Sequence, residues 1–84
     1  MVNLIVVVKA KTIFVEGKDA ATVASALASA AETTPDEEGN DRFKIRSYAF
    51  KDRTAYLLDL IEETGYRLVS TSVMTGAFHY FLTK

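Results

Sequence analysis

The stretch YRLVSTSVMTGAFHYFLT, residues 66–83, decides how the rest of the chain can be arranged. Two runs in it, Tyr66–Met74 and Ala77–Thr83, are rich in β-branched and aromatic residues, which favour strands. Between them, Thr75-Gly76 is a two-residue turn signal. The pattern therefore predicts an antiparallel hairpin.

The second strand of this hairpin is apolar on both faces. Phe78, Tyr80 and Leu82 alternate onto one face, whereas His79 and Phe81 fall on the other. A strand with two apolar faces needs cover on both of them. We therefore expect helices against one face and a neighbouring subunit against the other.

A helix precedes the hairpin. Asp52 or Thr54 is a suitable first residue, and Gly65 is placed to end the helix at the position after its C-cap. Its apolar residues form a broad face made of Leu57, Leu58, Leu60 and Ile61.

Before that helix, residues 42–50 (RFKIRSYAF) alternate in polarity and predict a strand, whereas residues 33–41 predict a loop. The charges of this region are opposed. Residues 32–41 carry five acids and no base, and residues 42–53 carry five bases and one acid. The acidic segment can neutralise the basic one, either within the chain or between subunits.

The first third of the chain predicts one long strand and one helix. Residues 2–15 are rich in valine and isoleucine, with a kink or bulge expected at Lys9-Ala10-Lys11. Asp19 is a good N-cap for an alanine-rich helix that runs to about Ala31. The element order β(β)αβαββ predicts an α+β fold, a two-layer sandwich with two helices on one face of a mostly antiparallel sheet.

The length of 84 residues predicts a single domain, residues 1–84, with a small core. The longest apolar run, Leu4–Val8, is too short to span a bilayer, and the chain begins without the pattern of a secretion signal. We therefore expect a cytoplasmic protein without a membrane partner. A small core also favours an obligate oligomer.

The residues needed for common catalytic sites are missing. With no cysteine and one histidine, the chain cannot form a zinc cluster or a Cys/His triad. Its four glycines are scattered, so there is no glycine-rich phosphate loop. We expect no catalytic residue, no metal site, no cofactor and no enzymatic activity, and His79 is interpreted as a packed or interface histidine.

Nucleic-acid binding is a weaker interpretation of residues 42–50. Aromatic side chains beside arginine and lysine are typical of sheets that bind single-stranded RNA. However, the glycines of the usual RNA-recognition strand are absent, and the net charge is −1. The sequence therefore argues against a nucleic-acid partner.

Residues 55–84 (AYLLDLIEETGYRLVSTSVMTGAFHYFLTK) resemble the end of the GTP cyclohydrolase I feedback regulatory protein family. The shared features begin with Leu58-Asp59, Glu62 and Gly65 in the helix and its end. The strand start Tyr66–Ser70 follows, and the similarity closes with Tyr80, Leu82 and Lys84. Over residues 43–54 the match is looser, and the first forty residues agree only in layout.

The resemblance implies a cytosolic, non-catalytic regulator that forms a ring of five subunits and docks on GTP cyclohydrolase I. In that family phenylalanine or tetrahydrobiopterin tunes the complex. The chain departs from the family at the hairpin turn, where Val73–Gly76 replaces a turn richer in glycine that lies near the effector. The resemblance and the hairpin together predict an effector site made of Arg67, Met74, Thr75, Gly76 and His79.

The sequence leaves a second function open. A small-ligand or nucleotide binding or sequestering module, an inhibitor protein of viral or host origin, would place Arg46, Tyr48, Arg67 and His79 around an anionic ligand. For the leading hypothesis, a homo-oligomeric regulator that docks on a larger enzyme, the expected interface residues are Arg46, Tyr48, Phe50, Phe78 and Tyr80.

Overall fold

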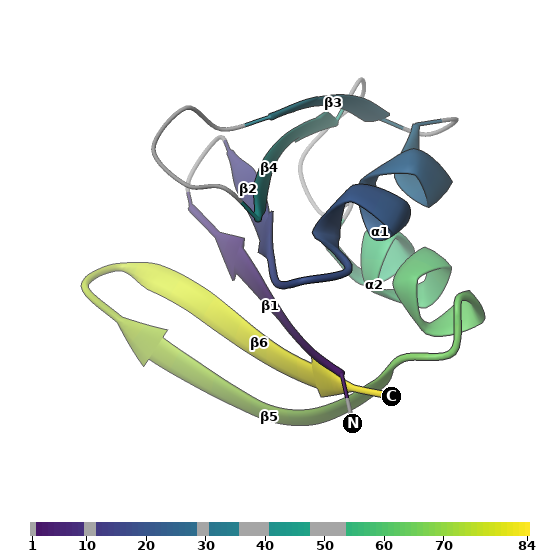
Figure 1. Ribbon diagram of the computed structural model, residues 1–84. Coiled ribbons are helices and arrows are strands. Elements are labelled where there is room, and N and C mark those ends of the chain that lie inside the picture. The colour runs from purple at the N-terminus through teal and green to yellow at the C-terminus, as the bar shows by residue number, and fades with distance from the viewer. Residues whose placement is uncertain (1, 10–11, 29–30, 36–40, 48–53) are drawn as a thin grey trace.

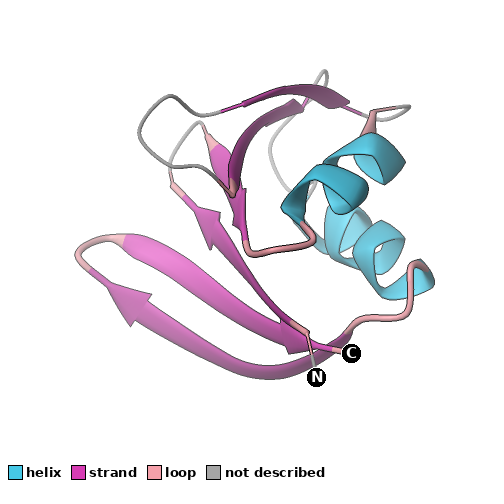
Figure 2. Cartoon of the chain, in the orientation of Figure 1, coloured by secondary structure: helices cyan, strands magenta, loops and turns pink. Residues whose placement is uncertain are grey.

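A computed structural model describes residues 2–9, 12–28, 31–35, 41–47 and 54–84. It has a single six-stranded sheet with two helices packed against one of its faces (Figures 1 and 2). The elements are β1 (Asn3–Val8), β2 (Ile13–Glu16), α1 (Ala20–Leu27), β3 (Ala31–Pro35), β4 (Arg42–Ser47), α2 (Thr54–Glu63), β5 (Arg67–Met74) and β6 (Ala77–Thr83).

The strands lie in the order β3-β4-β2-β1-β6-β5, and every neighbouring pair is antiparallel. This confirms the α+β class and the two-layer arrangement. β1 and β6 are central strands, and backbone hydrogen bonds between Val2 and Lys84 (2.8 and 2.9 Å) continue their pairing. The two edges of the sheet are β3 and β5.

The predicted long first strand is wrong in one respect. Its two halves are separate strands, β1 and β2, which fold back on each other antiparallel. The backbone N–H of Lys9 donates to the carbonyl of Thr12 at 2.8 Å, so the expected kink is a reversal of the chain. Two paired strands satisfy each other's backbone groups, which one long strand cannot do for itself.

The region after α1 also differs from the prediction. The helix ends at Leu27, and residues 31–35, expected to be the end of a helix and part of a loop, form the edge strand β3. Thr33 and Thr34 are β-branched and favour a strand once β4 supplies partners for their backbone groups. Residues 36–40 of the predicted acidic loop lie outside the described residues.

The C-terminal prediction is confirmed. β5 and β6 form an antiparallel hairpin around Thr75-Gly76, both of which have positive φ angles (49° and 78°), as in the two-residue turns that match the twist of a hairpin. Gly65, with a φ of 107°, follows the end of α2 as expected. β4 spans Arg42–Ser47, which confirms the described part of the predicted strand, and residues 48–53 lie outside the described part.

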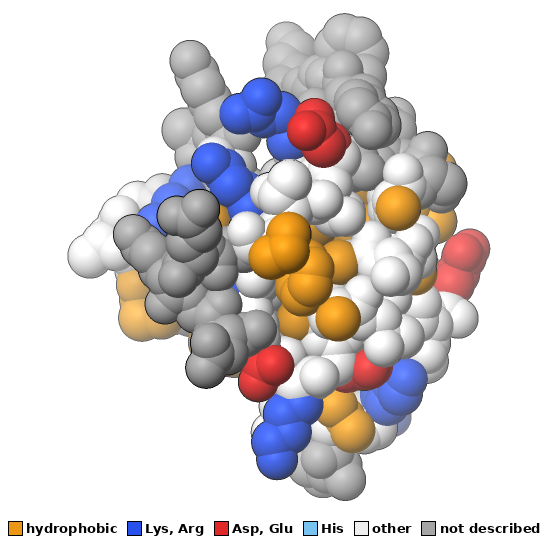
Figure 3. Space-filling view, turned by 45° about the horizontal axis from the view of Figure 1, so that its top comes forward, with side chains coloured by type: hydrophobic (Ala, Val, Ile, Leu, Met, Phe, Trp, Pro, Cys, Tyr) orange, Lys and Arg blue, Asp and Glu red, His pale blue; other side chains and the backbone are white. Residues whose placement is uncertain are grey.

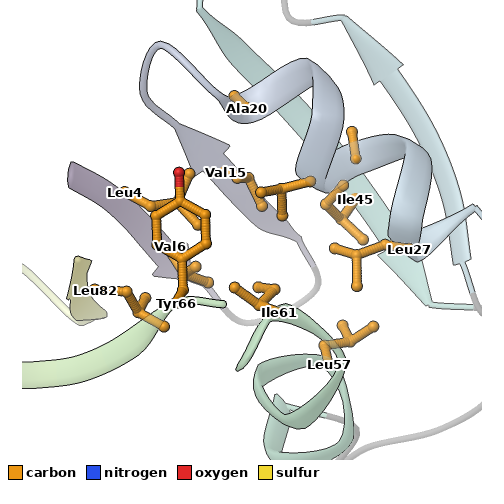
Figure 4. Packing of buried hydrophobic residues seen from close by; sticks show 12 residues of the cluster. Leu4, Val6, Val15, Ala20, Leu27, Ile45, Leu57, Ile61, Tyr66 and Leu82 are labelled. Carbon is orange, nitrogen blue, oxygen red and sulfur yellow. The ribbon is translucent and has the colours of Figure 1, made fainter. Parts of the chain in front are cut away.

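The core lies between the sheet and the helices. α1 contributes Val23 and Leu27, and α2 contributes Leu57 and Ile61, the innermost two of its four predicted apolar residues (Figure 4). The sheet supplies every second side chain from its central strands, among them Leu4, Val6, Val15, Ile45 and Leu82. Each of these is at most 3% exposed, so the face of the sheet that carries them is fully covered at its centre.

No helix in the described ranges has the length and apolar character needed to cross a bilayer.

Candidate interaction surface and open sheet face

The β5–β6 hairpin extends well beyond the two helices, so that its tip has no covering layer (Figure 1). Five large apolar side chains on this hairpin are exposed: Leu68 (38%), Val69 (56%), Val73 (65%), Met74 (46%) and Phe78 (51%). We call them the hairpin surface. Cross-strand register places Val73 directly opposite Phe78, on the same face of the sheet as the core, where the two extend the core stripe outside the helices.

β5 adds an unpaired backbone edge to the hairpin surface. It is eight residues long, and its outer side has no neighbouring strand among the described residues. Arg67, at its first residue, is the only charged side chain on the strand. Exposed edges without charges or proline readily pair with another chain. The hairpin therefore offers both apolar side chains and free backbone groups to a partner.

The structure does not bring the predicted effector residues together. Met74, Thr75 and Gly76 lie at the tip of the hairpin, whereas Arg67 lies at the opposite end of β5. At about 3.3 Å per residue the separation is on the order of 25 Å. His79 lies on the face of the sheet opposite the helices, paired with Ser72 and Val7. One small molecule cannot contact all five residues in a single subunit.

The predicted interface residues also divide between two regions. Phe78 is half exposed at the hairpin, and Tyr80 packs against the edge of the core. Arg46 is exposed on β4, three strands away from β6 in the sheet. Tyr48 and Phe50 lie outside the described residues. Only Phe78 and Tyr80, among the described members of the set, therefore belong to one continuous surface.

The second face of the sheet, which we call the open face, has no described helix against it. One row of side chains crosses all six strands there, and its register is fixed by the pairing of each strand with the next: Ser72, His79, Val7, Phe14, Lys44 and Thr34. Val7 is only 5% exposed although no described helix covers it. Its larger neighbours Phe14 and His79 shield it, so the apolar centre of the open face is partly covered by its own side chains.

Cations surround Phe14 on this face. The Arg42 guanidinium carbon is 4.1 Å from the centroid of the Phe14 ring, and the Lys9 ammonium is 5.3 Å from it. Both distances suit attraction between a cation and an aromatic ring, which contributes about 0.5–1 kcal/mol at exposed sites. The Arg42 Nε atom also lies 3.3 Å from a carboxylate oxygen of Glu16. Arg42 is therefore held in place on the open face.

Next to this cluster is a shallow hollow of about 180 Å³, lined by Glu32, Thr34, Lys44 and Arg46 from β3 and β4. Lys and Arg side chains gather toward the top of the view in Figure 3, with an acidic side chain beside them. Lys44 and Arg46 form no hydrogen bond or ion pair with any described residue. Glu32, the first residue of the acidic segment, is nevertheless the cross-strand partner of Arg46 and lines the same hollow, and residues 36–40 of that segment lie outside the described ranges.

A second polar cluster joins the start of α1 to the hairpin. The Tyr66 hydroxyl donates a hydrogen bond of 2.9 Å to a carboxylate oxygen of Asp19, and the Lys84 ammonium lies 3.6 Å from the same oxygen. The hydrogen bond from Tyr66 lowers the pKa of Asp19. Burial, followed by the Asp19 carboxylate, raises the pKa of Tyr66 to about 12. The expected capping bond from Asp19 to its own helix is not formed.

This second cluster fits a structural role better than a catalytic one. Tyr66 is 3% exposed and belongs to the core, and its pKa of about 12 lies even further above neutral pH than the ordinary value of 10. A cleft of about 490 Å³ near it is lined by Gly65, Arg67, Thr83 and Lys84. Among the residues that the structure describes, no group of three or more histidine or carboxylate side chains is placed to hold a metal ion.

Sequence reasoning missed Phe14, Lys9 and Thr34 as parts of the open face. Alternation along residues 42–50 did place Arg42, Lys44 and Arg46 on one side. However, which residues lie beside them depends on pairing with β2 and β3, which no local pattern in the sequence specifies. The signal for the hairpin surface was available, because residues 68–83 contain no Lys, Arg, Asp or Glu.

Comparison with known proteins does not add a family. No family model matches the chain, and no curated protein sequence matches it.

Proposed function

We propose that this protein is a non-catalytic regulatory protein that forms homo-oligomers and docks on a larger metabolic enzyme, whose activity it modulates in response to a small effector. The observation that carries the proposal is the hairpin surface. Its exposed apolar side chains, at 38–65% exposure, adjoin a free strand edge. Exposed large apolar side chains beside a free strand edge are typical of a binding site between proteins.

A comparison of the free energy gained by burying the hairpin surface with the free-energy cost of association favours an assembly in which each subunit makes more than one contact. Full burial of one large apolar side chain contributes about 1.5–3 kcal/mol, so five half-exposed ones would contribute roughly 4–8 kcal/mol. Association costs about 4–15 kcal/mol in lost freedom. The side chains alone therefore roughly offset this cost, and backbone pairing along β5 or a second contact must supply the rest. A closed ring, in which each subunit has two neighbours, meets that requirement.

The resemblance of residues 55–84 to the GTP cyclohydrolase I feedback regulatory family supports a specific partner and stoichiometry. We propose a ring of five subunits in the cytoplasm that docks on an enzyme similar to GTP cyclohydrolase I, with phenylalanine or a pterin as the effector. Met74, Thr75 and Gly76 would contact that effector at the docking surface. Because Arg67 lies on the order of 25 Å away along β5, it would have to act from a neighbouring subunit.

The experiment that tests the proposal is sedimentation of the purified chain at micromolar concentration, alone and with GTP cyclohydrolase I. We expect a species of several subunits that sediments together with the enzyme, and phenylalanine should change both the complex and the rate of GTP consumption. A chain that stays monomeric would contradict the oligomer. An oligomer that does not bind the enzyme would contradict the partner.

A further inference from the structure

The open face carries two exposed cations, Lys44 and Arg46, that form no ion pair with a described residue, and the carboxylate of Glu32 lies across from Arg46 on β3 and offsets part of their charge. Lys44 and Arg46 are alternate residues of β4 and therefore project from the same side of the sheet, about 6.7 Å apart along the strand. Thr34, directly opposite Lys44 on β3, brings a hydroxyl to the same hollow. Two cations and a hydroxyl around one hollow present several hydrogen-bond donors to a single ligand group.

Among the residues that the structure describes, the side chains on this face carry a net positive charge. Lys9, Arg42, Lys44 and Arg46 lie on it, against Glu16 and Glu32. Glu16 is already paired with Arg42, at 3.3 Å. The remaining excess of positive charge therefore lies around the hollow and around the Phe14 ring. An anion is the ligand class that this charge distribution attracts.

Beside the cations lies an aromatic and apolar area of the same face. Phe14 is directly opposite Lys44, and Val7 and His79 continue the row. The rings of His79 and Phe81 are stacked, with centroids 6.4 Å apart. The Nδ1 atom of His79 is buried and has no hydrogen-bond partner among the described residues. A ligand that lies across this row would contact the accessible parts of the Phe14 and His79 rings.

We propose that the open face binds a nucleotide, with its phosphate in the hollow between Lys44 and Arg46 and its base against the row from Phe14 to His79. A phosphate has three acceptor oxygens and a charge of about −1.5 to −2, so it can use both cations and the Thr34 hydroxyl at once. The Arg42 guanidinium, which covers Phe14, offers a flat cationic surface on which a base can stack. From Lys44 to His79 the row spans three strand spacings, about 14 Å, which leaves room for a phosphate and a base side by side.

The same charges favour a single nucleotide over a nucleic-acid strand. A strand needs a continuous positive groove along its backbone. Here Glu32 lines the hollow itself and Glu16 lies beside Arg42. One carboxylate therefore interrupts the positive area at the hollow, and another interrupts it next to Arg42. The site is distinct from the hairpin surface, so it does not depend on the regulatory function proposed above.

The test is isothermal titration of the full chain with AMP, adenosine and inorganic phosphate. We expect AMP to bind at least tenfold more tightly than either fragment, because each fragment uses only half of the site. Lys44→Gln and Arg46→Gln should each weaken AMP binding by about tenfold or more, the effect of losing one charge-assisted hydrogen bond. Lys18→Gln is the matched control, because it removes the same charge from an exposed residue beside α1. It should leave AMP binding unchanged.

Further variants separate the two halves of the site from each other and from the hairpin surface. His79→Ala should weaken AMP binding but not phosphate binding. Circular dichroism should show that each variant folds, and Val73→Lys, which disrupts the hairpin surface, should still bind AMP. The proposal is overturned if AMP does not bind, if phosphate binds as tightly as AMP, or if Lys18→Gln weakens binding as much as Lys44→Gln. Tighter, steeply salt-dependent binding of oligothymidine would overturn it in favour of a nucleic-acid strand.

Discussion

The two edge strands of the sheet differ in length and in the charge of their exposed side chains. β3 is five residues long, carries the charged residue Glu32 and ends at Pro35, which has no N–H to donate. β5 is eight residues long, and apart from Arg67 it presents only uncharged side chains, three of them large and apolar and more than 45% exposed: Val69, Val73 and Met74. Charge, proline and shortness are the means by which proteins protect a free edge.

The difference indicates which edge of the sheet is better suited to associate with another chain. β3 has the features of an edge that resists pairing with another chain, whereas β5 has only the charge of Arg67 at its start and a bulge between Leu68 and Ser70. Both strands belong to one continuous sheet, so they share the same twist and the same core. The contrast therefore comes from the side chains. If charged residues are placed on β5 and apolar residues on β3, the tendency to pair with another chain should move from β5 toward β3.

The largest effect is expected for Val73→Lys. If β5 lies in the subunit interface, this change removes a buried apolar side chain and places an unpaired ammonium there, which costs about 3 kcal/mol or roughly 100-fold in the dissociation constant. Thr34→Lys, which puts the same charge on β3, should leave association unchanged. Sedimentation equilibrium of both variants measures the difference, and equal effects of the two would show that β5 is not special.

A smaller effect is expected for Phe78→Ser, which removes the exposed aromatic ring opposite Val73. Loss of its burial should weaken association about tenfold, while the free energy of unfolding of the dissociated chain changes by no more than about 0.5 kcal/mol, as is usual for surface positions. Tyr56→Ser on α2 removes an aromatic ring of similar exposure (44%) away from the hairpin. If both variants weaken association alike, the effect is one of general surface polarity.

The stability contributed by the Tyr66 hydroxyl, next to the start of β5, should decrease at alkaline pH. Tyr66 immediately precedes the strand, and its pKa in the folded chain, about 12, lies above the ordinary value of 10. The stability that its protonated hydroxyl contributes is therefore complete below pH 10 and is lost as the pH rises from 10 to 12. In urea titrations across this range, the unfolding free energy of Tyr66→Phe should fall less steeply than that of the wild type. Identical slopes would rule out this contribution.

The smallest effect is expected for Glu32→Val on β3. Removal of the charge makes this edge more apolar, but Pro35 and the short length remain, so self-association should increase by less than about tenfold. The change is best measured in the Val73→Lys background, where association through β5 is already weakened. Strong aggregation of the double variant would mean that Glu32 alone protects the edge.

Local patterns explain why some elements were predictable. Thr75-Gly76 combines turn chemistry with a strand pattern on both sides, and the apolar spacing of Leu57 and Ile61 fits one helix face. These signals lie within a few residues of one another. Consequently the hairpin, α2 and the α+β class follow from the sequence.

Features that depend on distant partners were not predictable. Thr33 and Thr34 become a strand only because β4 lies beside them, and Phe14 becomes a neighbour of Lys44 only through the register of β2 with β4. Asp19 illustrates the same limit. Local rules predict that it caps its own helix, but its carboxylate instead accepts a hydrogen bond from Tyr66, 47 residues further on.

The pairing of β1 with β6 has a kinetic consequence. Asn3 pairs with Thr83 and Val8 pairs with Phe78, so two neighbouring inner strands of the sheet join segments 70 to 80 residues apart in the sequence. Closing so long a loop is entropically costly, and contacts of such high sequence separation slow folding. During synthesis, β1 has only β2 as a partner until Thr83 has emerged. We therefore expect the nascent chain to expose the valine-rich side of β1 and to rely on chaperones until synthesis of β6 is complete.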